Sequence, residues 1–114
     1  MSGKKVIDAQ LMDAHITSDW FSLRGHTMVS YQIFTEEDAP TADHVGTITF
    51  EVTNDTAATG KEIVLDIPQL YIPTGSEYLD GAEITDLPWT DIRVKYTRTS
   101  GGTDDRLTVI LAAE

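Results

Sequence analysis

A chain of 114 residues is the size of a single domain built around one hydrophobic core. Nineteen acidic residues against eight Lys and Arg residues give a formal net charge of −11. This argues against nucleic acid or an anionic membrane as partner, because both need a local excess of positive charge. Cysteine is absent, which excludes disulfides and thiolate metal sites.

Residues 1–17 are predicted to form an N-terminal arm or a first edge strand. Val6 and Ile7 are apolar, but the segment after them has no strong periodicity. The segment also lacks the uninterrupted apolar run of a signal peptide, and no stretch approaches membrane-spanning length. We therefore expect a protein that is made and kept in the cytoplasm until it is assembled.

A first hairpin is predicted between residues 18 and 34. A short strand carrying Trp20 and Phe21 is followed by turn residues 24–26, and then by a strand over residues 27–34 that alternates apolar and polar side chains. We expect these two strands to pair.

A second hairpin is predicted between residues 46–53 and 62–67. The first strand alternates with Phe50 on its apolar face, and residues 54–60 have the composition of a turn. In the second strand, the core would be supplied by Ile63, Leu65 and Ile67.

Residues 68–88 are predicted to be an edge or a connection, because Pro68, Pro73 and Pro88 each remove a ladder donor. Their large apolar side chains would be costly to leave exposed together, so this stretch either wraps the sandwich or contacts another subunit. Together with the arm, the expected interface residues are Val6, Ile7, Tyr71, Tyr78, Leu79 and Leu87.

The C-terminal part carries the clearest pattern in the chain. Over residues 89–98, Ile92, Val94 and Tyr96 alternate with polar residues, and the alternation resumes over residues 107–111 after a Ser-Gly-Gly loop. We predict an antiparallel hairpin here. The expected core anchors of the whole domain are Trp20, Phe50, Trp89, Val94, Tyr96 and Val109.

Six to eight short strands without an amphipathic helix predict an all-β fold. We expect a two-sheet antiparallel β-sandwich over residues 18–114. Its topology is immunoglobulin-like or jelly-roll, because one sequence does not reveal the order of strands in space.

Candidate chemistry is sparse. His15, His26 and His44 lack the spacing of metal ligands, and Ser100 lacks the Gly-x-Ser-x-Gly elbow of a nucleophile. Loop carboxylate pairs are typical of solvated turns, and the ordered calcium-loop pattern is absent. We expect no enzymatic activity, no metal and no cofactor.

Two further features have alternative interpretations. Trp20 and Trp89 could stack on sugar rings, but both are flanked by core-like alternation, which favours buried anchors at the end of the sandwich. The basic residues Arg93, Lys95 and Arg98 share one strand region, and they favour a solvated sheet face over a stripe that meets an acidic partner.

Several segments resemble small β-sandwich virion structural proteins of bacteriophages. They are residues 18–23 (SDWFSL), 46–55 (GTITFEVTND), 89–102 (WTDIRVKYTRTSGG) and 107–113 (LTVILAA). The similarity spans roughly residues 18 to 113. It is interrupted by an insertion around residues 56–88, which begins with Thr56 where these proteins usually carry glycine.

The resemblance implies an accessory capsid protein of the cement or decoration type, made in the host cytoplasm and bound to the virion surface. Its partners would be the major capsid protein or other virion proteins. A homo-oligomer is implied, with a trimer favoured because capsid sites are symmetric. Two alternatives stay open: a tail or head-fibre module that binds carbohydrate or a receptor, and a penton or minor shell subunit.

Overall fold

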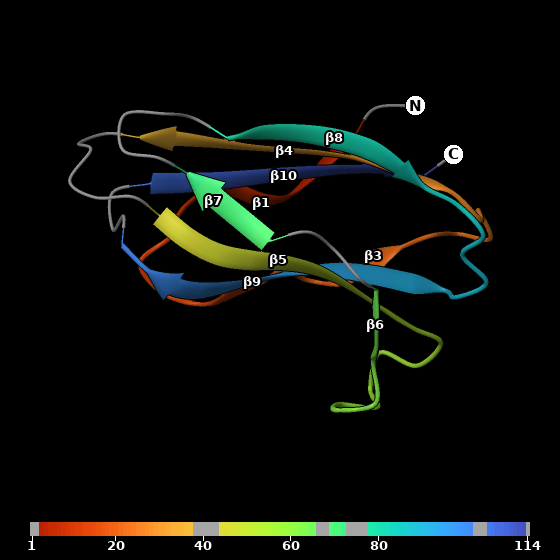
Figure 1. Ribbon diagram of the computed structural model, residues 1–114. Helices are drawn as coiled ribbons and strands as arrows, with labels where there is room; N and C mark the ends of the chain where they lie inside the picture. Colours follow the sequence, from red (N-terminus) through yellow and green to blue (C-terminus); the bar gives the residue numbers. More distant parts are fainter. Residues whose placement is uncertain (1–2, 38–43, 66–68, 73–77, 102–104, 114) are drawn as a thin grey trace.

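The computed structural model describes residues 3–37, 44–65, 69–72, 78–101 and 105–113 (Figure 1). Over these residues the chain forms strands and connections without a helix, and the strands build two antiparallel sheets. The predicted two-sheet antiparallel β-sandwich is confirmed. The predicted number of strands is too low, because several short, separate strands build the edges of one sheet.

The structure has ten strands in its described part. In chain order they are β1 (Lys4–Leu11), β2 (Ile16–Thr17), β3 (Phe21–Ser22), β4 (Val29–Glu37), β5 (His44–Thr53), β6 (Ile63–Leu65), β7 (Gln69–Ile72), β8 (Leu79–Ile84), β9 (Asp91–Ser100) and β10 (Asp105–Ala113).

Both sheets are four strand positions wide, but in the second sheet two short strands share each edge position. One sheet has four strands in the order β1-β10-β4-β8. The other has six strands around the central pair β9 and β5. β2 and β3 pair with β9 on the side away from β5, and β6 and β7 pair with β5 on the side away from β9.

The pairing is nested along the chain. β1 pairs with β10, β2 and β3 pair with β9, β4 pairs with β8, and β5 pairs with β6 and β7. Such nesting describes one long antiparallel hairpin that is folded over, so that successive pairs fall in alternate sheets. This is the connectivity of a jelly roll, which decides between the two predicted topologies.

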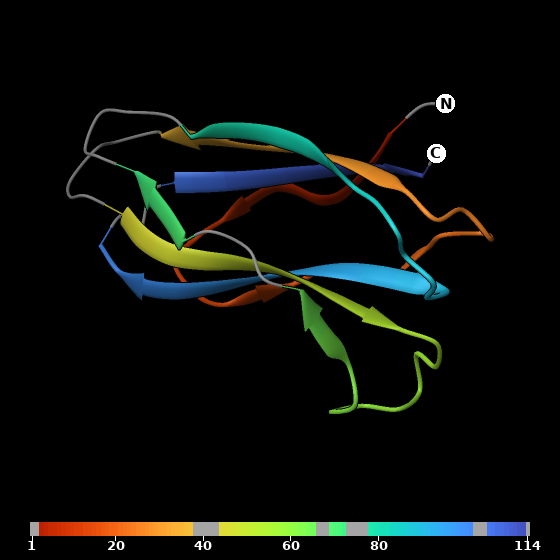
Figure 2. The same cartoon turned by 45° about the vertical axis from the view of Figure 1, so that its right-hand side comes forward.

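Two of the predicted hairpins are wrong. β9 and β10 have the expected alternation, but β9 pairs with β5 while β10 pairs with β4 in the facing sheet (Figure 2). β3 and β4 are likewise in different sheets. Alternation records which side of a strand is buried, and a strand of either sheet shows the same pattern. The hairpin of β5 and β6 is confirmed.

The N-terminal segment belongs to both sheets. β1 is an edge strand of the four-stranded sheet, and the chain then crosses to the other sheet, where Ile16 pairs with Tyr96. Residues 1–17 are predicted to form either an arm or an edge strand, and residues 4–11 form an edge strand. The proposed insertion around residues 56–88 supplies β6, β7 and β8, so it completes edges of both sheets.

The hydrophobic core lies between the sheets. Tyr31 and Phe50 meet across it with ring centroids 5.0 Å apart. Gly46 makes room for the ring of Tyr96, because a Cβ at this glycine would lie 2.7 Å from Tyr96 Cε1. The buried cluster consists of Ile7, Met12, Ile16, Leu23, Val29, Ile33, Ile48, Phe50, Val52, Leu87, Ile92, Val94, Tyr96, Leu107, Val109 and Leu111.

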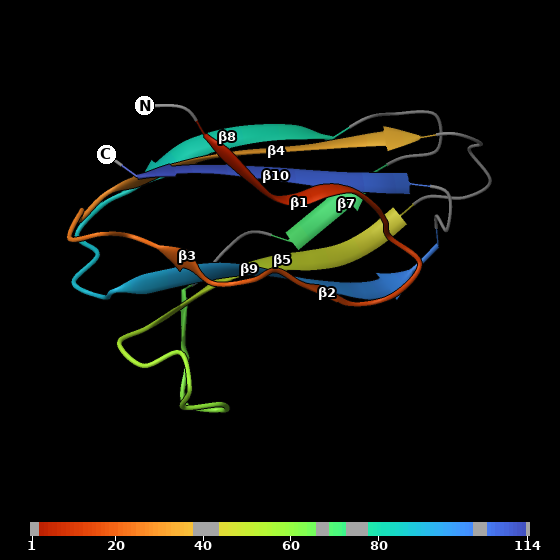
Figure 3. The ribbon, with the colours of Figure 1, turned by 180° about the vertical axis from the view of Figure 1, so that it is seen from behind.

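The β5–β6 hairpin projects from the sandwich on the side of the six-stranded sheet (Figure 1 and Figure 3). The prediction that Ile63 supplies the core is wrong, because its side chain is 50% exposed on this projection. Leu65 is the residue of β6 that packs against the core. Ile67 lies outside the described residues.

Candidate functional site

The expected core anchors lie in two kinds of place. Phe50, Val94, Tyr96 and Val109 are fully buried between the sheets. Trp89 is half-buried and packs against the edge of the core. These five residues come from three segments, β5, β9 with the residues just before it, and β10, which meet only because the chain crosses repeatedly between the sheets.

The expectation for Trp20 as a buried anchor needs correction. Its neighbour Phe21 pairs with Ile92 and packs against the core, so the alternation of the strand turns Trp20 the other way. The half-buried indole lies under Arg93, whose guanidinium carbon is 4.4 Å from the ring centroid. This is a cation–π contact.

Two of the expected interface residues are also corrected. Ile7 and Leu87 are each only 2% exposed, because they fill the space between the sheets and therefore cannot meet a partner. Val6 and Tyr78 are half-buried and pack against the same core. Tyr71 lies in β7, but its side chain is outside the described residues.

The outer face of the four-stranded sheet carries an apolar strip, formed by Leu79, Phe34 and Ile110. Leu79 of β8 is 73% exposed and lies opposite Phe34 of β4. In the neighbouring row, Ile110 of β10 lies opposite Gln32. No charged side chain interrupts these two rows between β8 and β10, so the strip is an uncharged surface in a highly charged protein.

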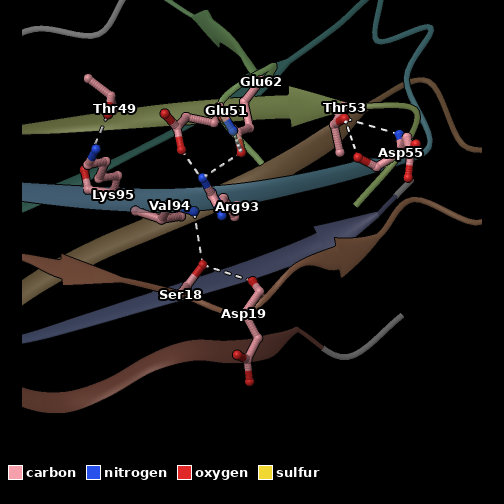
Figure 4. Close-up of polar contacts among 11 residues, drawn as sticks. Ser18, Asp19, Thr49, Glu51, Thr53, Asp55, Glu62, Arg93, Val94 and Lys95 are labelled. Atoms are coloured by element: carbon pink, nitrogen blue, oxygen red, sulfur yellow. Dashed lines mark hydrogen bonds and ion pairs between the residues drawn. The ribbon is translucent and has the colours of Figure 1, made fainter. Parts of the chain in front are cut away.

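The outer face of the six-stranded sheet is polar, and its centre is an ionic cluster (Figure 4). Arg93 Nε of β9 donates a hydrogen bond to Glu51 Oε1 of β5 at 2.8 Å. Its Nη2 lies 3.2 Å from Oε1 of Glu62, which ends the loop of the projecting hairpin just before β6. With Trp20 below the guanidinium, the cluster joins three parts of the sheet. Sequence reasoning missed this cluster.

The position of Glu62 also controls its ionisation. Its pKa is lowered, first by backbone N–H groups of Glu62 itself and Gly60, and then by the positive charges of Arg93 and Lys95. Gly60 N donates to Glu62 Oε1 at 3.1 Å. The carboxylate therefore closes the loop of the hairpin and ties it to the sheet, which is a structural role.

The edge strand β8 carries a carboxylate on the side facing the other sheet. The hydroxyl groups of Tyr31 and Tyr78 donate to Asp80 Oδ2 at 3.5 and 3.4 Å. Burial raises the pKa of both tyrosines, and the nearby charge of Asp80 raises it further. A charge that points inward from an edge strand discourages pairing with another chain.

Among the described side chains, the histidines and basic residues highlighted by the sequence do not gather, and the side chain of His44 lies outside the described residues. His15 Nδ1 accepts a hydrogen bond from the backbone N–H of Arg98 at 3.0 Å. His26 instead lines a cavity together with Phe21 of β3. The Arg98 side chain donates to the Gly101 carbonyl at 2.9 Å. Because Arg93 is held in the ionic cluster, the three basic residues do not present one open stripe.

In the part of the chain that the structure describes, no three His, Asp or Glu side chains gather closely enough to hold a metal ion. The same residues include no helix with the length and hydropathy needed to cross a bilayer. No protein-family model matches the chain, and no curated protein matches it significantly.

Proposed function

We propose that this protein is a non-enzymatic structural component of a bacteriophage virion. In this proposal it is an accessory capsid protein of the cement or decoration type, which binds the shell through protein–protein contacts. The jelly-roll sandwich supports the proposal by analogy alone, because the same architecture occurs in capsid proteins and in lectins. The motifs of β5, β9 and β10 that resemble phage virion proteins support it in the same way.

One observation carries the proposal. Among the described residues, the large apolar side chains that are most exposed are Ile63, Val64 and Leu79. Ile63 and Val64 lie on the projecting hairpin, whereas Leu79 belongs to the apolar strip on the outer face of the opposite sheet. A sandwich with apolar contacts on both sides is suited to bridge two neighbouring subunits.

The energetics of such bridging are favourable in a shell. Burial of each of these side chains contributes about 1.5–3 kcal/mol. The contribution is made only in the assembled state, and it is repeated at every symmetry-related site. The net charge of −11 keeps free copies soluble and favours docking beside a basic surface of the shell.

The test is co-sedimentation with particles of the encoding phage that lack this protein. Wild-type protein should saturate the particles at a fixed number of copies per shell. Leu79→Glu and the double variant Ile63→Glu/Val64→Glu should each lower the affinity about tenfold or more, because a charge replaces a buried apolar contact. Thr17→Glu, at an exposed position of the polar sheet, is the matched control and should bind as wild type.

Two results would refute the proposal. One is the absence of wild-type protein from purified particles together with no binding in the reconstitution. The other is saturable binding that both apolar-surface variants leave unchanged. Analytical ultracentrifugation of the free protein tests the associated proposal of a homo-oligomer, with a trimer expected and a monomer at all concentrations contradicting it.

A further inference from the structure

A second feature of the molecule is independent of these apolar surfaces. At one open end of the sandwich, between edge strand β1 of one sheet and edge strand β3 of the other, there is a cavity of about 340 Å³. This volume lies in the range of small-molecule sites. The residues that line it include Lys4, Trp20, Phe21, Ser22, Arg24 and His26.

The charge of this cavity is opposite to that of the protein. Lys4 and Arg24 line it together with His26, and no Asp or Glu is among the described residues of the lining. The whole chain has only eight Lys and Arg residues against nineteen acidic ones. Two cations in a concave site whose described lining includes no carboxylate therefore provide local attraction for an anion.

Arg24 is held by a rigid turn. Leu23 before it is fully buried, and its backbone N–H donates to the Thr90 carbonyl at 2.8 Å. His26 N then donates to the Leu23 carbonyl at 2.9 Å, which closes the turn. Inside this turn Arg24 has a φ of 51°, a backbone conformation that a residue with a side chain adopts at a cost. The guanidinium is thus presented from a fixed backbone.

The remaining lining groups indicate what kind of anion fits. Trp20 and Phe21 supply aromatic surface at the cavity, and Ser22 adds a hydroxyl group. Arg93 already stabilises the indole of Trp20 through its cation–π contact. Aromatic surface, a hydroxyl and two cations together suit a ligand that has a compact ring, hydroxyl groups and one carboxylate.

We propose that this cavity is a binding site for a single acidic sugar residue, such as a uronic or sialic acid. Its carboxylate pairs with Arg24 and Lys4, and its ring packs against the aromatic side chains. A flexible acidic peptide is the less suitable ligand, because it would lie along an open groove or a strand edge, whereas this site is a concave pocket at the sandwich end. The site does not depend on the proposed capsid role.

The test uses the full chain and three soluble probes: D-glucuronate, N-acetylneuraminate and uncharged D-glucose. Binding is followed by tryptophan fluorescence and by NMR shifts of backbone amides. At least one acidic sugar should bind saturably with a dissociation constant of roughly 1 mM, and about tenfold more tightly than glucose. The shifted amides should be those of β3 and of the turn at residues 24–26.

Arg24→Gln should weaken the binding of the acidic sugar about tenfold. Arg106→Gln removes the same charge on β10 outside the cavity lining and should bind as wild type. A spectrum of dispersed amide signals confirms that each variant is folded before it is titrated.

Three outcomes would overturn the proposal. They are no saturable change with either acidic sugar at tens of millimolar, equal loss of binding in Arg24→Gln and Arg106→Gln, and equal or tighter binding of acetate or of an oligoglutamate peptide. The last outcome would assign the site to simple carboxylates or to acidic protein segments.

Discussion

At the residue scale, the ionic cluster of the six-stranded sheet holds a carboxylate that is almost buried. Glu51 is only 7% exposed, and Arg93 supplies its counter-charge at 2.8 Å. Removing one member of a largely buried pair leaves an uncompensated charge, whereas replacing both members removes that cost.

We therefore expect Arg93→Met to lower the free energy of unfolding by about 2–3 kcal/mol, discounted from a fully buried pair because Arg93 keeps some contact with water. The double variant Arg93→Met/Glu51→Met should recover most of this loss. Urea denaturation measures both. Equal destabilisation in the single and double variants would show that the cluster acts through packing on Trp20 instead.

Tyr96 gives a prediction about alkaline pH. Burial is the main reason that the pKa of Tyr96 is raised from its ordinary value of 10.0 to about 12; the charge of Arg98 opposes this rise and that of Asp105 adds to it. Because the folded-state pKa is the higher one, the associated stability is complete below pH 10 and is lost as the pH rises toward 12. The loss should amount to roughly 2–3 kcal/mol.

Chemical denaturation at a series of alkaline pH values measures this slope. Tyr96→Phe is the control, since it keeps the ring against Gly46 but cannot ionise. Its stability should fall less steeply between pH 10 and 12 than that of wild type. Parallel slopes for the two proteins would mean that other groups, such as lysines, cause the alkaline loss.

At the element scale, the projecting hairpin is held to the sandwich by Leu65 at one end of β6 and by Glu62 just before its other end. Ile63 and Val64 are half or more exposed, so β6 has little apolar burial of its own. Glu62 links its loop to Arg93. The hairpin is therefore the element in which local opening should require the least free energy.

We expect Glu62→Gln to speed the hydrogen exchange of the β6 amides while leaving β9 and β10 unchanged. The pKa of Glu62 is lower in the folded state than its ordinary value of 4.5. The stability that Glu62 gives the hairpin is therefore present above pH 4.5 and is lost as the pH falls through the folded-state pKa. Wild-type β6 should thus exchange like the variant in acid, after correction for the intrinsic rate. Glu83→Gln on exposed β8 is the control. Faster exchange in all strands of Glu62→Gln would mean that the residue supports the whole fold.

At the scale of the whole molecule, the nested pairing interlocks the two sheets. The first described strand pairs with the last, and the chain passes repeatedly from one sheet to the other. The strands of each sheet are separated along the chain by strands of the other sheet, so neither sheet is formed by one continuous stretch of chain. The two sheets should therefore unfold together.

Far-ultraviolet and near-ultraviolet circular dichroism should give one coincident thermal transition. Ile7→Ala in β1 creates a cavity in the core and should lower the free energy of unfolding by about 2–5 kcal/mol. Hydrogen exchange should register that loss in β9 of the opposite sheet as well as in β10. If Ile7→Ala made the amides of β10 exchange faster while those of β9 exchanged as in wild type, the two sheets would not be interlocked.

The sequence by itself determined the fold class and the direction of many side chains. Alternation with a period of two is a local property of a strand, so it correctly placed Phe50, Val94, Tyr96 and Val109 toward the interior. Clusters of glycine, proline and polar residues marked connections for the same local reason.

Only the tertiary structure decided which strands are neighbours. A strand with one apolar face satisfies either sheet of a sandwich, so β9 and β10 could be read as a hairpin although they face each other across the core. The pairing of Arg93 with Glu51, the burial of Leu87, and the meeting of Lys4 with Arg24 at one cavity all depend on that choice. These contacts join residues far apart in the chain, and their free energy arises only when the whole set of pairings forms together.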